Sequence, residues 1–178
     1  ASIAFWTRFR AFYDVVQGIE KPVITALNGV AAGSGFQFTM LTDMVVGHKN
    51  ARMGQTEVNS GFGSVTGTYL MCQSLGKSRA MELALSGRLM EGEELYRLGL
   101  VHRLVDEKDV LGTAVEIAAE WGAKSRIAVG LTKRAHRQAT KEGFDKIWDM
   151  AIQYQTEILK NRATSDALDA FFAKRAQR

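Results

Sequence analysis

The fold of this chain is decided by the stretch Asn28-Gly29-Val30-Ala31-Ala32-Gly33-Ser34-Gly35. An apolar strand over residues 23–27 leads into it through an Asn-Gly turn, and an apolar helix over residues 35–42 follows. Gly33 and Gly35 lack a Cβ, so a ligand can approach the main chain there. The free N–H groups of the first helical turn favour negative charge. The stretch therefore predicts either an anion site, which is an oxyanion hole if the charge develops during a reaction, or tight packing of a strand on a helix.

Hydrophobic periodicity predicts alternating helices and strands up to residue 105 and helices alone after it. The expected helices cover residues 3–17, 35–42, 63–75, 77–85 and 91–98, and the expected strands cover 23–27, 44–47 and 100–105. Segment 48–62 is rich in loops, with a short extended piece near residues 51–53. The pattern predicts an α/β core over 1–105 and a helical C-terminal region over 106–178.

Composition excludes several classes of protein. The chain has 178 residues, the length of one domain, and a net charge of +4 without a nucleic-acid-binding motif. No apolar run is long enough to span a membrane. The glycines lack the full dinucleotide fingerprint, and the three histidines lack metal-ligand spacing, so neither NAD nor a metal ion is expected. The single cysteine, Cys72, fits a reducing compartment.

Four segments share their order and spacing with one known family. They are 21–35, Asp43-Met44-Val45-Val46, Gly54-Gln55-Thr56-Glu57 and Gly99-Leu100-Val101. They resemble the crotonase superfamily of enoyl-CoA hydratases and isomerases, over roughly residues 15–175. The resemblance implies a crotonase-like ββα spiral core, of which this chain is the C-terminal portion without the first strands. It also implies that the all-helical C-terminal region makes oligomer contacts.

The resemblance also implies an activity on acyl-CoA thioesters. Glu57 matches the family's acid–base glutamate, and the backbone N–H of Ser34, in the Gly33–Gly35 loop, matches an oxyanion-hole donor. Phe171 and Lys174 match residues that line the acyl-CoA site of a neighbouring subunit. A terminal amphipathic helix with a basic tail would show the same sequence pattern, so this alternative stays open.

Similar proteins are homotrimers or homohexamers. They need no cofactor, because coenzyme A is part of the substrate, and they have no nucleic-acid or membrane partner. They lie in the cytoplasm, or in the mitochondrial matrix of a eukaryote.

Gln37 departs from the family pattern, because hydratases of this family usually carry a second glutamate there. Glutamine forms hydrogen bonds but cannot accept a proton at neutral pH. The sequence therefore favours proton transfer by Glu57 alone over hydration by two carboxylates. A one-glutamate hydratase-lyase, an acyl-CoA decarboxylase and a non-catalytic CoA-binding or interaction homologue remain alternatives.

Overall fold

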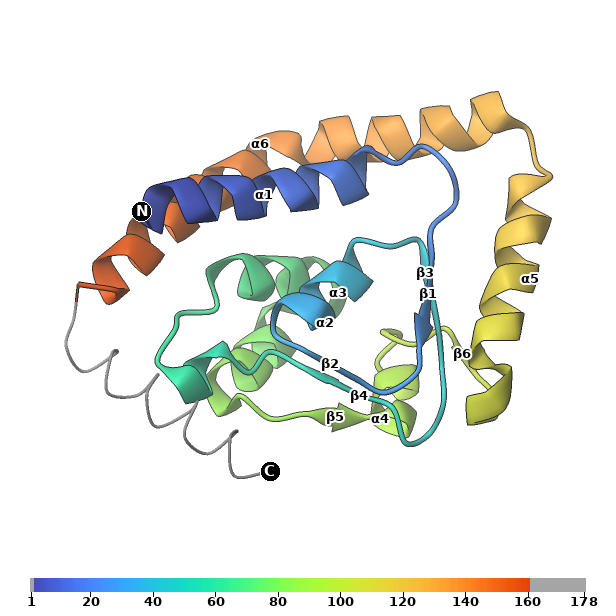
Figure 1. Cartoon of the computed structure of the whole chain (residues 1–178), viewed down its shortest axis with the longest axis horizontal. Coiled ribbons are helices and arrows are strands. Elements are labelled where there is room, and N and C mark those ends of the chain that lie inside the picture. The colour runs from blue at the N-terminus through green and yellow to red at the C-terminus, as the bar shows by residue number, and fades with distance from the viewer. Residues whose placement is uncertain (1, 161–178) are drawn as a thin grey trace.

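The computed structural model describes residues 2–160, and its elements confirm the predicted α/β class (Figure 1). In chain order they are α1 (Ser2–Gly18), β1 (Ile24–Leu27), β2 (Val30–Ala32), α2 (Ser34–Met40), β3 (Met44–Gly47), β4 (Arg52–Gly54), the 3-10 helix η1 (Glu57–Ser60), α3 (Val65–Ser86), β5 (Met90–Glu91), α4 (Gly92–Arg97), β6 (Arg103–Leu104), the 3-10 helix η2 (Glu107–Asp109), α5 (Val110–Gly122) and α6 (Arg126–Ile158). None of the helices in this part of the chain is long and apolar enough to cross a membrane.

The strands form two small sheets, β1-β3-β6 and β2-β4-β5. In the first sheet all neighbours are parallel, and in the second β2 pairs with β4 in parallel while β5 is antiparallel. The chain crosses from one sheet to the other twice in the same way, from β1 to β2 and from β3 to β4, and each time a helical turn follows. This repeated strand–strand–helix unit places the start of α2 and the start of η1 next to each other in the fold.

Two strands were not predicted from the sequence, and one is shorter than predicted. β2 has only three residues, two of them alanines, and β5 has two residues, so neither carries a hydrophobic alternation. The predicted strand 100–105 contains only β6, because the N–H groups of Leu100 and Val101 both donate to the carbonyl of Leu95 and so close α4. The predicted break at Gly76 is confirmed, since its φ of 73° interrupts α3.

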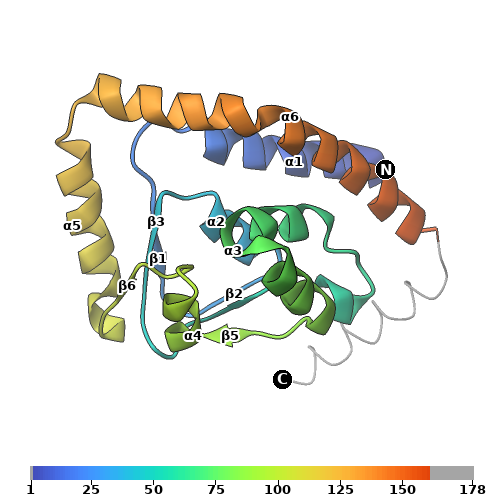
Figure 2. The ribbon, with the colours of Figure 1, turned by 180° about the vertical axis from the view of Figure 1, so that it is seen from behind.

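Helices cover the sheets and create the core. α5 packs on β1 and β3 through one apolar stripe that includes Val110, Ala114 and Ile117. The long helix α6 lies alongside α1 in both views of the molecule (Figures 1 and 2). Between α1, α6 and the start of α3 lies an aromatic cluster centred on Tyr13 and Trp148, which are 0 % and 2 % exposed. This cluster forms one wall of the candidate site.

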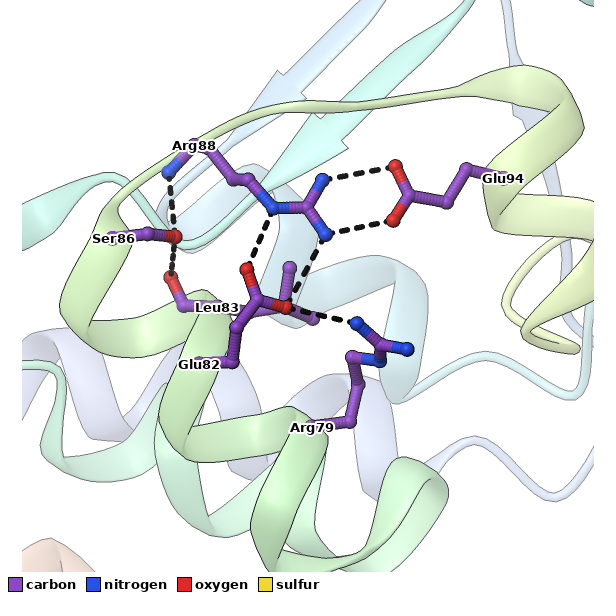
Figure 3. Close-up of polar contacts among 6 residues, drawn as sticks. All are labelled: Arg79, Glu82, Leu83, Ser86, Arg88 and Glu94. Carbon is purple, nitrogen blue, oxygen red and sulfur yellow. Dashed lines mark hydrogen bonds and ion pairs between the residues drawn. The ribbon is translucent and has the colours of Figure 1, made fainter.

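An ion network connects the C-terminal half of α3 to α4 (Figure 3). The guanidinium of Arg88 donates to both carboxylate oxygens of Glu94, at 2.9 and 2.7 Å, and to those of Glu82, at 2.7 and 3.2 Å. Arg79 donates to Glu82 as well, at 3.1 Å. These hydrogen bonds from Arg88 hold the pKa of each glutamate below its usual value.

We expect Arg88→Met to lower the free energy of unfolding by about 0.5–1 kcal/mol at neutral pH, the range for a partly exposed ion pair. The folded-state pKa values of Glu82 and Glu94 are lowered, so the stabilisation is present above the unfolded pKa of about 4.3 and is lost as the pH falls through the lower folded-state values. Urea unfolding of the full-length protein at neutral and acidic pH measures the effect. Arg97→Met, at an exposed residue of α4, is the control. If the difference in free energy of unfolding between Arg88→Met and wild type stayed the same in acid, this would contradict a stabilising role of the ion network.

Candidate active site

Gly33 joins β2 to α2 with φ 58° and ψ −121°, a conformation that L side chains rarely adopt. Its N–H donates to the carbonyl of Gly54 at 2.9 Å, and its own carbonyl accepts the N–H of Gln37 at 3.0 Å. A Cβ at Gly33 would lie 3.1 Å from Oε1 of Glu57. The positive φ therefore favours glycine at this position, and a Cβ would also crowd the Glu57 carboxylate. At Gly35 a Cβ would make only an ordinary contact with Ala31, so packing alone does not require glycine there.

The side chain of Gln37 is buried and its amide is held on both sides. The hydroxyl groups of Tyr13 and Thr66 each donate to its Oε1 at 2.8 Å. Its Nε2 donates to Oε1 of Glu57 at 2.9 Å. Because an ionised carboxylate only accepts hydrogen bonds, the nitrogen of the amide must face Glu57 and the oxygen must face the two hydroxyls. Gln37 therefore holds the carboxylate in place.

Burial raises the pKa of Glu57 above its usual value, and hydrogen bonds, among them the one from Gln37, oppose this shift. While Oε1 accepts from Gln37, Oε2 is buried and has no partner among residues 2–160. Glu57 and Gln37 line a cavity of about 150 Å³. The other lining residues are Trp6, Phe9, Tyr13, Ser34, Phe62, Gly63, Ser64, Val65, Thr66, Trp148, Ala151 and Gln155. This is the arrangement that a general acid–base group needs: a carboxyl group poised by a largely apolar pocket, with one free oxygen.

Tyr13 and Ser34 complete the polar side of the cavity. Burial, together with the negative charge of Glu57, raises the pKa of Tyr13, so its phenol stays protonated and donates to Gln37. Ser34 is the first residue of α2, and N–H groups in a first helical turn have no partner within the helix. The structure thus brings Gly33, Ser34, Gln37 and Glu57 together.

Two residues that hold the Gln37 amide in the site were not identified from the sequence. Tyr13 comes from α1 and Thr66 from α3, 24 residues before and 29 residues after Gln37. No motif or spacing marks them, because their contacts with Gln37 arise only when three helices pack together. The predicted ligand-binding residues Phe171 and Lys174 lie outside the described residues. Within the described part of the chain, no three His, Cys, Asp or Glu side chains could together hold a metal ion.

Comparison with known proteins gives a consistent result. The family model described as enoyl-CoA hydratase/isomerase matches residues 2–178. The chain is 37 % identical over 156 residues to a mevalonyl-coenzyme A hydratase of Aspergillus fumigatus, covering 87 % of this chain and 52 % of that protein. It is 33 % identical over 165 residues to a short-chain-enoyl-CoA hydratase of Clostridium acetobutylicum, covering 88 % of this chain and 60 % of that protein. The chain thus spans between about half and two thirds of these relatives' length.

A solved structure of an enoyl-CoA hydratase/isomerase from Pseudoalteromonas atlantica superimposes with a TM-score of 0.85 at 26 % identity, covering 92 % of this chain and 66 % of that one. The predicted crotonase-like core, with its helical C-terminal region, is therefore confirmed.

Glu57→Gln should stabilise the folded protein at neutral pH. Because burial raises the folded-state pKa of Glu57, the folded protein binds this proton more tightly than the unfolded chain does. The stability that this tighter proton binding contributes is fully present below the unfolded pKa of about 4.3. It is lost as the pH rises through the folded-state pKa. The substituted side chain is neutral at every pH, so its stability advantage should be largest at neutral pH and should narrow in acid. Urea unfolding of the full-length protein across this range measures it, with Glu116→Gln, at an exposed residue of α5, as control. A stability advantage of Glu57→Gln that grows as the pH falls would contradict the raised pKa of Glu57.

Proposed function

The chain belongs to the enoyl-CoA hydratase/isomerase family, and we propose that the protein is an acyl-CoA enzyme in which Glu57 alone moves the proton. The observation that carries this proposal is the carboxylate of Glu57, with Oε1 held by Gln37 and Oε2 buried without a partner beside a cavity. The relatives named hydratases support the substrate class, a CoA thioester. Glu57 takes a proton from the carbon chain of the thioester and returns it at another carbon.

Removing a proton next to a thioester places negative charge on the thioester oxygen. In this proposal the backbone N–H of Ser34 donates to that oxygen, since Ser34 lines the same cavity as Glu57. One such donor is typically worth about 3–4 kcal/mol of transition-state stabilisation. Gly33 allows this geometry because its positive φ turns the chain into α2 directly beneath the Glu57 carboxylate.

Gln37 positions Glu57 and does not itself transfer a proton, because its oxygen already accepts two hydrogen bonds and its nitrogen cannot accept a proton. This favours isomerisation by a single base over hydration by two carboxylates. A one-glutamate hydratase-lyase or an acyl-CoA decarboxylase uses the same arrangement and remains an alternative. A non-catalytic CoA-binding homologue is disfavoured, because a buried carboxylate oxygen without a partner costs stability and packs no better than an apolar group.

We propose that the protein assembles as a homotrimer or homohexamer, as similar proteins do. Apolar side chains that α1 and α5 leave exposed, such as Phe5, Phe12, Leu111 and Val115, support an assembly that buries them. From the same resemblance we propose that the enzyme works in the cytoplasm, or in the mitochondrial matrix of a eukaryote.

Glu57→Gln should reduce turnover of the enzyme's own CoA thioester by about a hundredfold or more, because the substitution keeps the shape and removes the proton acceptor. Binding of the thioester should change little. Steady-state kinetics and a calorimetric titration on the full-length protein separate the two effects, with Glu116→Gln as control. Normal turnover of the Glu57 variant would exclude Glu57 as the base.

The unmodified enzyme should hydrate crotonyl-CoA about 10²–10⁴-fold more slowly than a hydratase with two glutamates does, because one of two acid–base groups is absent. Gln37→Glu should raise hydration more than isomerisation. Its carboxyl group would face Glu57 at hydrogen-bond distance, so the pair would share a proton at neutral pH. Both reactions are followed by the absorbance of the conjugated thioester, with Gln37→Met as the variant that removes the amide without adding an acid. Rapid hydration by the unmodified protein would refute the single-base proposal.

A further inference from the structure

The cavity that Glu57 lines is small, with a volume of about 150 Å³. A protein cavity of about this volume holds one benzene molecule, so the space suffices for roughly six carbon atoms. The nucleotide and pantetheine parts of coenzyme A are far larger than this, so they have to stay outside and only the acyl group can enter. The volume of the cavity therefore bears directly on the length of the acyl group that Glu57 can reach.

Aromatic side chains form one wall of this cavity, and Trp6, Phe9, Tyr13 and Trp148 line it. Tyr13 and Trp148, which are 0 % and 2 % exposed, meet edge to face with ring centroids 4.9 Å apart. Phe9 meets both rings edge to face, at 5.4 Å from Tyr13 and 6.3 Å from Trp148. Behind this wall Trp148 also contacts the ring of Phe144, at 6.4 Å. These separations lie in the favourable range for aromatic pairs, so the rings hold one another in place.

A wall of this kind does not move aside easily for a longer chain. Turning the ring of Trp148 would break its contacts with three other rings and would force closely packed neighbours to shift. Tyr13 is held in addition by the hydrogen bond of 2.8 Å from its hydroxyl group to Gln37. A short acyl group fills space that already exists, whereas a longer one overpacks the wall, and overpacking is unfavourable.

We propose that the site selects short acyl groups, of up to about six carbon atoms, and that Phe9 and Trp148 set this limit. The inference rests on the proposed function, because it specifies the acyl group on which Glu57 acts. Neither ring takes part in proton transfer. They determine specificity by shape, since they occupy the space that further carbon atoms of the chain would need.

The test measures kcat/KM and calorimetric affinity of the full-length protein for but-2-enoyl-CoA, hex-2-enoyl-CoA, oct-2-enoyl-CoA and dec-2-enoyl-CoA. We expect both quantities to favour hex-2-enoyl-CoA over dec-2-enoyl-CoA by about tenfold or more. Phe9→Leu and Trp148→Leu each replace a ring with a smaller side chain, so each should reduce this preference by about threefold or more. Phe144→Leu is the matched control, because Phe144 belongs to the same aromatic cluster but does not line the cavity.

Equal kcat/KM and equal affinity along the series would overturn the inference. A preference for short chains that both variants retain, or that Phe144→Leu reduces as strongly as they do, would also overturn it. If Trp148→Leu does not fold, Phe9→Leu decides the outcome, because Phe9 is only half-buried. Absence of turnover with every thioester would refute the proposed acid–base function instead. The calorimetric affinities would then still decide whether the cavity limits the length of the acyl group.

Discussion

The candidate site depends on one hydrogen bond, from Nε2 of Gln37 to Oε1 of Glu57. It connects α2 to η1 beside Gly33, where a Cβ would lie only 3.1 Å from the carboxylate of Glu57. The amide can donate in this direction because Tyr13 and Thr66 hold its oxygen. The geometry of the carboxylate therefore exists only when α1, α2, η1 and α3 are all in place, and the site is a direct product of the packing between them.

This arrangement has an energetic cost. Burial disfavours the charged form of Glu57, and hydrogen bonds offset only part of that cost, since the pKa remains raised. Oε2 has no donor among the described residues. A side chain that served stability alone would be replaced by an apolar or amide group of similar size. A buried carboxyl group beside a cavity, with a raised pKa, is instead typical of catalytic positions.

The sequence predicted the elements that carry a strong local signal and missed those that depend on distant contacts. β1, β3 and α2 follow from apolar runs that the Asn28-Gly29 turn and the polar residues Thr42 and Asp43 separate, and the break at Gly76 follows from its freedom at positive φ. The short strands β2 and β5 carry no such pattern and form only because β4 lies between them. In the site, the motif identified Glu57 and the departure from it identified Gln37. Tyr13 and Thr66 could not be identified from the sequence, because a hydroxyl group that contacts an amide on another helix produces no recognisable spacing between residues.

The fixed amide also limits what reaction the site can perform. An amide oxygen has two acceptor positions, and here Tyr13 and Thr66 occupy both. Its nitrogen has two hydrogens, of which one is used by Glu57. Gln37 can therefore offer a water molecule one donor and no acceptor. An attacking water must give up a proton, and on these residues only Oε2 of Glu57 can receive it. In the proposed function Glu57 removes a proton and returns it to another carbon of the same chain, a reaction that needs no bound water and therefore no acceptor on Gln37.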